Sequence, residues 1–163
     1  MGNKAVICSY IEGETVEQFN KDRENELRKY ANETMAVYLH WQGNEEKVRA
    51  FLMYCKFKGY RPANEDCYGW ARLVQVISNY IGGELGIGIG NFYNFIIEDN
   101  GVYLIKNWEI KGKYYDDEWV DEIVDESTML ELIKEINKCQ PVAEQIEEKE
   151  LERMVNKEYS PSF

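Results

Sequence analysis

The fold class is decided by residues 35–59, which read MAVYLHWQGNEEKVRAFLMYCKFKG. The first seven of these residues alternate as in a half-buried strand, with Val37, Leu39 and Trp41 on one face. A Gln-Gly turn follows, and from Asn44 the apolar residues recur every three or four positions, as in an amphipathic helix ending near Gly59. A strand joined directly to such a helix predicts a domain that mixes α and β structure.

The sequence on either side extends this pattern. Upstream, the β-branched run Ala5–Ile11 predicts a first strand, and Thr15 suits the cap of a charged helix over about 15–31, inserted between the two strands. Downstream, a second strong helix starts near Asp66, and strands are expected over 84–90 and 102–105.

These elements predict an α+β fold, with a largely antiparallel sheet packed with two core helices. Residues 1–114 form this core. Residues 115–163 add an acidic helical C-terminal region to the same compact unit, with helices over about 127–138 and up to about residue 156. The residues expected in the core include Trp41, Trp70, Leu73 and Val74.

The composition narrows the class of function. The chain has 163 residues, 19 basic and 30 acidic, with a formal net charge of −11. Direct nucleic-acid binding relies on clustered Lys and Arg, so this balance excludes a generic DNA or RNA binder. Apolar runs fall short of the roughly 20 residues that a membrane span needs. The four cysteines lack zinc-ligand spacing and there is one histidine, so we expect no metal, no cofactor and reduced thiols in a cytosolic protein.

Nearly all of the negative charge lies in one region. Residues 1–114 carry 14 basic and 15 acidic residues, whereas residues 115–153 carry 4 basic and 14 acidic ones. The side chains that we expect to contact a partner lie in its densest part: Asp116, Asp117, Glu118, Trp119, Asp121, Glu122, Asp125 and Glu126. A second acidic group comprises Glu144, Glu147, Glu148, Glu150 and Glu152.

This charge has two interpretations. It is either a solvated face that keeps the protein in solution, or a surface that imitates the phosphates of a nucleic acid. In the second case the carboxylates enter the basic groove of a protein that binds DNA or RNA, and aromatic residues such as Trp119 anchor the interface.

The stretch with catalytic character is residues 64–70, NEDCYGW. Cys67 starts a predicted helix, where the helix dipole favours a thiolate. The string resembles the Asp-Cys-Ser-Gly signature of NlpC-type cysteine peptidases, which implies a histidine base. The sole histidine, His40, lies upstream, so a hydrolase would need a permuted arrangement of the two. The other interpretation is that Cys67 packs and that His40 is a hydrogen-bonded structural residue.

A third function class is a small-ligand module, such as one that binds a nucleotide signal, with its site on the aromatic and glycine-rich stretch 85–95. Arg61 and Arg72 are candidate cations for that site. The glycines of Gly86–Asn91 lack both the Gly-x-Gly-x-x-Gly spacing and the Lys-Ser/Thr of known phosphate loops. Alternating glycines in a strand more simply let a large ring pack closely.

Five segments carry a resemblance to a family of small proteins from bacteria, their phages and mobile elements. They are GNKAVI (2–7), VYLHWQG (37–43), YGWARLVQVISN (68–79), GGELGIGI (82–89) and DNGVYLIKNWEI (99–110). They are similar to the family strings GNRAVI, YLHWNGG, YGWARLCQVI, GGxLSIGI and DNGVYxIxDWEI. The resemblance covers roughly residues 2–112 and departs at the charged helix. It implies no reaction and therefore no catalytic residue.

By analogy with small acidic proteins of mobile elements, the resemblance implies an anti-CRISPR or other anti-defence role. The leading hypothesis is a non-enzymatic acidic inhibitor that occupies the nucleic-acid groove of a host defence nuclease, either a CRISPR effector or a restriction enzyme. The alternatives are a cysteine hydrolase that uses Cys67 with His40, and the small-ligand module.

Overall fold

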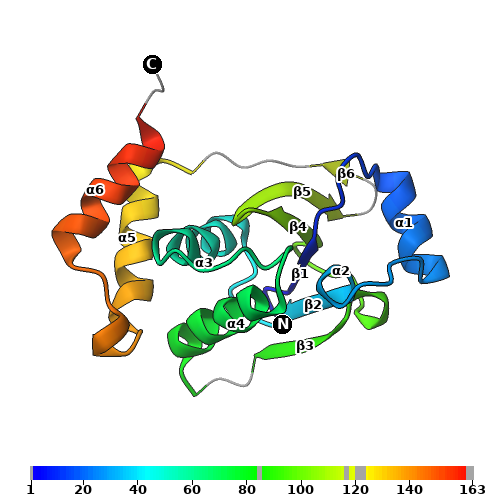
Figure 1. The fold of residues 1–163 in the computed structure, drawn as a ribbon, viewed down its shortest axis with the longest axis horizontal. Coiled ribbons are helices and arrows are strands. Elements are labelled where there is room, and N and C mark those ends of the chain that lie inside the picture. Colours follow the sequence, from blue (N-terminus) through cyan, green and yellow to red (C-terminus); the bar gives the residue numbers. More distant parts are fainter. Residues whose placement is uncertain (1, 84–85, 116–117, 120–123, 161–163) are drawn as a thin grey trace.

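The computed structural model describes residues 2–83, 86–115, 118–119 and 124–160, and its centre is a six-stranded sheet in the order β3-β2-β1-β4-β5-β6 (Figure 1). The strands are β1 (Ala5–Ser9), β2 (Met35–Leu39), β3 (Ile87–Asn91), β4 (Val102–Lys106), β5 (Glu109–Tyr115) and β6 (Glu118–Trp119). Neighbouring strands are antiparallel except for β1 and β4, which are parallel. The predicted α+β fold with a largely antiparallel sheet is confirmed.

The helices cover both faces of this sheet. They are α1 (Val16–Asn25), α2 (Ala31–Thr34), α3 (Glu45–Phe57), α4 (Cys67–Ile81), α5 (Glu126–Lys138) and α6 (Glu148–Tyr159). Helices α3 and α4 lie on one side, and α5 and α6 form a further layer beyond α3 (Figure 1). Within the described residues, no helix has the length and apolar character needed to cross a lipid bilayer.

The alternation of β2 places Val37 and Leu39 on one face, as predicted, but both faces of the strand meet apolar clusters. Val37 and Leu39 point into the main core, together with α3, α4, α5 and α6. Ala36 points to the opposite face, into a smaller cluster with Phe19 of α1 and Phe92. The sheet is therefore buried on both faces, and the C-terminal helices share the core of the strands.

Two expectations about this core need correction. Trp41 lies just beyond the end of β2 and is 43% exposed, so it is not a core residue. The charged helix ends at Asn25 and not near residue 31, because Glu26 adopts a left-handed conformation (φ 52°). It also does more than cover the surface, because it buries Phe19 and Asp22. Trp70 and Leu73 are fully buried as expected, and Val74 is half-buried.

The glycines of β3 pack against aromatic rings, which confirms their structural interpretation. A Cβ atom at Gly90 would lie 3.2 Å from the Phe95 ring, and one at Gly88 would lie 3.8 Å from the Tyr38 ring. The Tyr38 and Phe95 rings are themselves stacked, with their centroids 5.6 Å apart. The protein's own side chains therefore occupy the space beneath these glycines.

Candidate functional site

The acidic segment, residues 115–126, links the edge of the sheet to α5 (Figure 1). It carries seven acidic residues and no basic one. Near its start β6 pairs with β5, with Tyr114 opposite Trp119. Near its end the Tyr159 hydroxyl of α6 donates a hydrogen bond to the carbonyl of Val124 (2.8 Å). Both ends of the acidic segment are therefore attached to the folded core.

Most of the predicted partner contacts belong to the middle of this segment. The backbones of Glu118 and Trp119 form β6. The expected contacts that lie outside the described residues are Asp116, Asp117, Asp121 and Glu122.

The last two predicted contacts have structural roles. The Asp125 carboxylate accepts a hydrogen bond from the backbone N–H of Thr128 (2.8 Å) and caps α5, and this bond lowers the pKa of Asp125. Glu126 accepts one from the Asn156 side chain of α6 (3.0 Å). These carboxylates hold the start of α5 and the end of α6, so they are poor choices for a test of partner binding.

The second acidic group is largely neutralised within the protein. Four of its five glutamates form ion pairs with lysine or arginine. The pairs are Glu144–Lys58 (3.4 Å), Glu148–Lys134 (3.2 Å), Glu152–Lys134 (2.8 Å) and Glu150–Arg153. This group therefore offers less free negative charge to a partner than the sequence suggests.

A cleft of about 380 Å³ lies beside the end of the acidic segment. Its walls come from α3, the turn between β4 and β5, and α6, and Val124 closes one side. Apolar side chains such as Met53 line it together with two cations, Arg49 and Lys56. Both cations already have partners, Glu45 (2.9 Å) and Glu158 (2.9 Å). No local sequence signal could have revealed this cleft, because its lining comes from four distant segments.

Trp108 forms part of this cleft and lies in a tight turn. Asn107 and Trp108 are the two residues that join β4 to β5, and both have positive φ (52° and 62°), as a two-residue type I′ hairpin turn requires. The Trp108 side chain is buried, and its indole N–H donates to the carbonyl of Tyr60 (2.9 Å). Trp108 and the other apolar side chains of the lining make the cleft a candidate small-ligand site among the described residues.

The structure does not bring Cys67 and His40 together. His40 follows the last residue of β2, where its N–H donates to Gly86 (2.7 Å) and its ring lies 3.1 Å from the Tyr38 hydroxyl. Cys67 is exposed at the first residue of α4. That end of α4 lies near Asn32, before the other end of β2, because the Trp70 indole donates to the Asn32 carbonyl (3.3 Å). The strand between the two ends is about 16 Å long.

The two arginines suggested for a ligand site near β3 are engaged elsewhere. Arg61 forms an ion pair with Asp66 (2.7 Å) and lies over the Tyr68 ring. Arg72 donates to Gln75 (3.1 Å) on the same helix. They belong to α4 and the loop before it, and the space under the β3 glycines is filled by aromatic rings.

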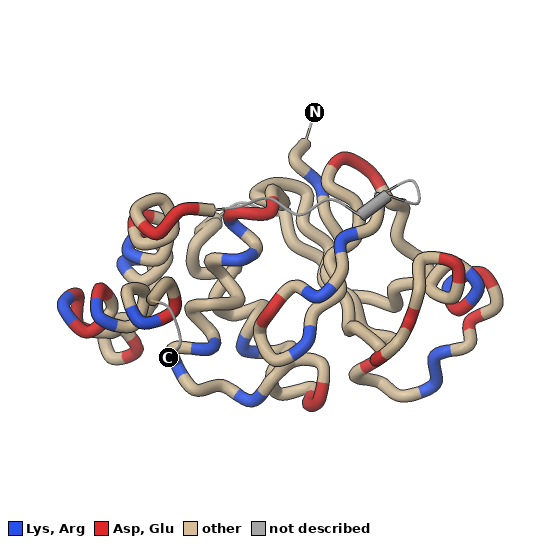
Figure 2. Tube along the Cα trace, turned by 90° about the horizontal axis from the view of Figure 1, so that it is seen from above, with Lys and Arg blue, Asp and Glu red and all other residues tan. Residues whose placement is uncertain are grey.

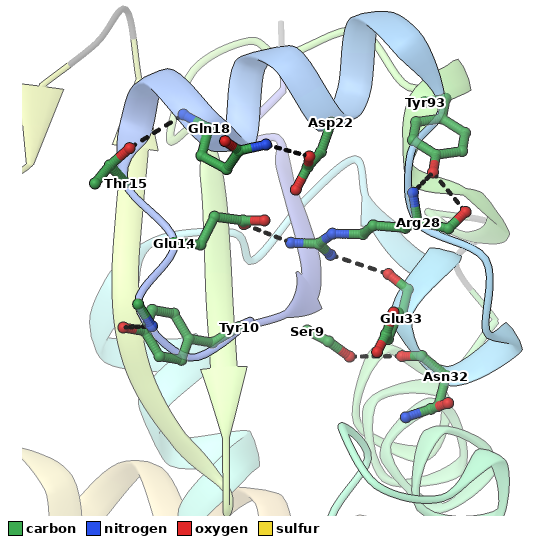
Figure 3. Close-up of polar contacts among 11 residues, drawn as sticks. Ser9, Tyr10, Glu14, Thr15, Gln18, Asp22, Arg28, Asn32, Glu33 and Tyr93 are labelled. Carbon is green, nitrogen blue, oxygen red and sulfur yellow. Dashed lines mark hydrogen bonds and ion pairs between the residues drawn. The ribbon is translucent and has the colours of Figure 1, made fainter.

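A buried polar cluster, which the sequence did not reveal, lies between α1 and the sheet (Figure 3). The Arg28 guanidinium forms an ion pair with Glu14 (2.7 Å), donates to the carbonyl of Glu33 (2.9 Å) and lies 4.4 Å from the centre of the Phe92 ring. Nearby, the Gln18 amide donates to Asp22 (2.7 Å). Arg28 and Glu14 looked like ordinary surface charges because no local pattern marks an ion pair that the fold buries.

The two carboxyl groups of this cluster have pKa values shifted in opposite directions. Burial and a hydrogen bond with Asp22 raise the pKa of Glu14 to about 7, although Arg28 opposes the shift. The same hydrogen bond lowers the pKa of Asp22. Of the two carboxyl groups, Glu14 therefore takes up a proton at the higher pH. The Cys8 thiol nearby is inert because burial raises its pKa to about 12.

The segments behind the family resemblance have clear structural roles. A Cβ atom at Gly69 would lie 2.3 Å from the Arg61 carbonyl, so only glycine fits there.

In the parts of the chain that the structure describes, no three His, Cys, Asp or Glu side chains are placed to hold a metal ion. Comparison with known proteins finds no family model, no curated protein and no solved structure that matches this chain.

Proposed function

We propose that the protein is a non-enzymatic acidic inhibitor from a phage or mobile element. It occupies the nucleic-acid groove of a host defence nuclease, such as a CRISPR effector or a restriction enzyme. The observation that carries this proposal is the acidic segment, with seven carboxylates and no cation between two attached ends. A segment attached at both ends loses less conformational entropy on binding than a free tail does.

The distribution of charge across the rest of the molecule supports the same proposal. Residues 1–114 are almost neutral, and most of the second acidic group is paired. Charged residues of both signs are spread over the other elements (Figure 2). A basic groove would therefore be attracted mainly to the acidic segment. The separation of Cys67 from His40 removes the arrangement that the hydrolase alternative requires.

The test is a charge-neutralised variant in which Asp116, Asp117 and Asp121 become Asn and Glu122 becomes Gln. Purified CRISPR effectors and restriction enzymes are assayed for DNA binding with increasing amounts of each protein. We expect the wild type to displace DNA, less effectively at high salt, and the variant to need at least about 30-fold more protein, equivalent to about 2 kcal/mol.

A matched control removes the same number of charges elsewhere. Glu24, Glu131, Glu135 and Glu147 are exposed and form no ion pair within the described residues, and the control changes all four to Gln. It should inhibit like the wild type. An equal loss of inhibition in both variants would mean that net charge alone acts. Inhibition that survives in the first variant would refute the role of the acidic segment.

A second candidate function is binding of a small ligand in the cleft beside Trp108. The observation in its favour is the cleft volume of about 380 Å³, which lies in the range of known ligand sites. Calorimetric titration with a panel of nucleotides tests it, with Met53→Trp as a variant that fills the cleft. Binding that is lost in this variant would support the second candidate, and heats indistinguishable from buffer across the panel would reject it for nucleotides.

A further inference from the structure

The strand β3 forms an open edge of the sheet. Among the residues that the structure describes, it pairs with β2 alone, and no strand lies on its other side. Ile89 in its middle is 58% exposed. At the opposite edge, the described part of β6 comprises Glu118–Trp119. Edge strands present unpaired N–H and C=O groups and are usually protected by charged residues or proline. In contrast, residues 85–97 contain neither.

The register of β3 identifies which backbone groups are free. The N–H of His40 donates to the carbonyl of Gly86 (2.7 Å), so this pair is a hydrogen-bonded one. Hydrogen-bonded and non-hydrogen-bonded pairs alternate along an antiparallel ladder. Gly88 and Gly90 therefore bond to β2, and the N–H and C=O groups of Ile87 and Ile89 point to the open edge.

The sequence of this edge is self-complementary. Residues 86–90 read Gly-Ile-Gly-Ile-Gly, the same in both directions. If two copies meet antiparallel across a two-fold axis at Gly88, Ile87 of each copy lies opposite Ile89 of the other. These are the residues with free backbone groups, so four new hydrogen bonds form. Side chains opposite each other share a face, and the four isoleucines make one apolar cluster.

We propose that the β3 edge is a homodimer interface in which two copies pair antiparallel about Gly88 and form one continuous sheet. The occupant is a second copy because the edge is palindromic and because residues 85–97 carry no charge, so the contact itself is free of like-charge repulsion. The net charge of −11 on each chain opposes the approach of the two molecules at longer range. Salt screens that repulsion and should tighten the dimer.

This proposal does not rest on the inhibitory function, and salt separates the two. Binding through the acidic segment weakens as salt increases, whereas dimerisation through the neutral edge strengthens. If the dimer proposal fails, the proposed inhibitory function is unaffected, and the reverse also holds.

Sedimentation velocity on the full chain, from about 1 µM to about 1 mM, tests the association. We expect a monomer–dimer equilibrium that shifts toward dimer when salt is raised to about 0.5 M. Ile89→Lys should raise the dissociation constant at least tenfold, because it places like charges on the paired edges. The matched control is Ile96→Lys, since Ile96 is 74% exposed and lies outside β3. It should associate like the wild type.

A cross-link tests the register. With Cys67 and Cys139 changed to Ser, a Gly88→Cys variant should form a disulfide-linked dimer under oxidised glutathione, because directly opposed residues lie within disulfide reach. The new side chain fits, since its Cβ lies 3.8 Å from the Tyr38 ring. Ile96→Cys in the same background should form no disulfide-linked dimer.

Three results would overturn the proposal. If the chain stays monomeric at every concentration and salt tested, the β3 edge does not pair with a second copy. An extended segment of another protein would then be the remaining candidate occupant. A dimer unaffected by Ile89→Lys would lie on a different surface. A dimer that is broken by Ile89→Lys but is not cross-linked at position 88 would have another register.

Discussion

The Arg28 guanidinium lies 2.7 Å from the Glu14 carboxylate, and both side chains are at most 2% exposed. This ion pair joins the loop before α1 to the loop after it, beneath the smaller apolar cluster (Figure 3). Removing one partner of a buried pair leaves the other without compensation. The ion pair therefore holds the two ends of the charged insertion together.

The first prediction concerns Arg28→Met. We expect the free energy of unfolding to fall by about 3–5 kcal/mol, because Glu14 loses its partner inside the protein. Urea denaturation measures the change. Lys21→Ala is the control, since the ion pair of Lys21 with Glu17 on α1 is exposed. This substitution should change the free energy of unfolding little. In the double variant Glu14→Gln/Arg28→Met, part of the loss should be recovered. Equal destabilisation by the single and double variants would show that the charge of Glu14 is not the cause.

The second prediction concerns the pH dependence of stability. The pKa of Glu14 rises from 4.5 to about 7 on folding, so the folded protein binds this proton more tightly than the unfolded chain. The resulting stability is fully present below pH 4.5 and is lost as the pH rises toward 7. Asp22 acts in the opposite direction and below its ordinary pKa of 3.8, so the two pH windows do not overlap.

Urea midpoints of the wild type and Glu14→Gln, compared between about pH 5 and pH 8, isolate this contribution. The difference in stability between the two proteins should change by more than 1 kcal/mol across this range, with the wild type relatively more stable at low pH. Parallel pH profiles would contradict the assignment of the proton to Glu14.

The third prediction concerns Asn137 of α5, which is buried and connects three parts of the fold. It accepts hydrogen bonds from the Tyr54 hydroxyl (2.8 Å) and the Ile146 N–H (2.9 Å), and it donates to the Ile146 carbonyl (2.8 Å). Asn137→Ala should cost about 2–4 kcal/mol, and Tyr54→Phe only about 1 kcal/mol, because it removes one bond of the three. Thermal unfolding of both variants shows which substitution destabilises the protein more. A larger loss of stability in Tyr54→Phe than in Asn137→Ala would contradict the prediction.

The fourth prediction concerns the cysteines. Cys67 and Cys139 are exposed, whereas Cys8 and Cys55 are buried and burial raises the pKa of both thiols. A thiol reagent should therefore label two residues rapidly in the native protein and all four after unfolding.

Cys67→Ser should inhibit a target nuclease as well as the wild type does. If this substitution abolished the activity, the protein would act as a cysteine enzyme.

Local patterns predicted most of the helices and strands. The side chain of Thr15 caps α1 where the sequence placed a cap, because such a bond joins residues three positions apart. The alternation of β2 assigned Val37 and Ala36 to opposite faces for the same reason.

Contacts between distant residues could not be read in this way. The parallel pairing of β1 with β4 joins Val6 to Val102, and no property of either strand specifies that partner. The cleft beside Trp108 and the Glu14–Arg28 pair arise in the same manner, from segments that meet only in the folded chain. Trp41 was misplaced because a strand pattern does not show where the strand leaves the core.

The central position of β1 also governs how the chain folds during synthesis. β1 is made first, yet it lies between β2 and β4 (Figure 1), and β4 ends at Lys106. At about 5–20 residues per second, the ribosome needs several seconds after completing β2 before β4 can follow. During that interval the hairpin of β1 and β2 has an unpaired inner edge and few apolar neighbours. We therefore expect slow codons between β2 and β4 to lower the yield of folded protein, because they lengthen the time for which β1 is unpaired on one side.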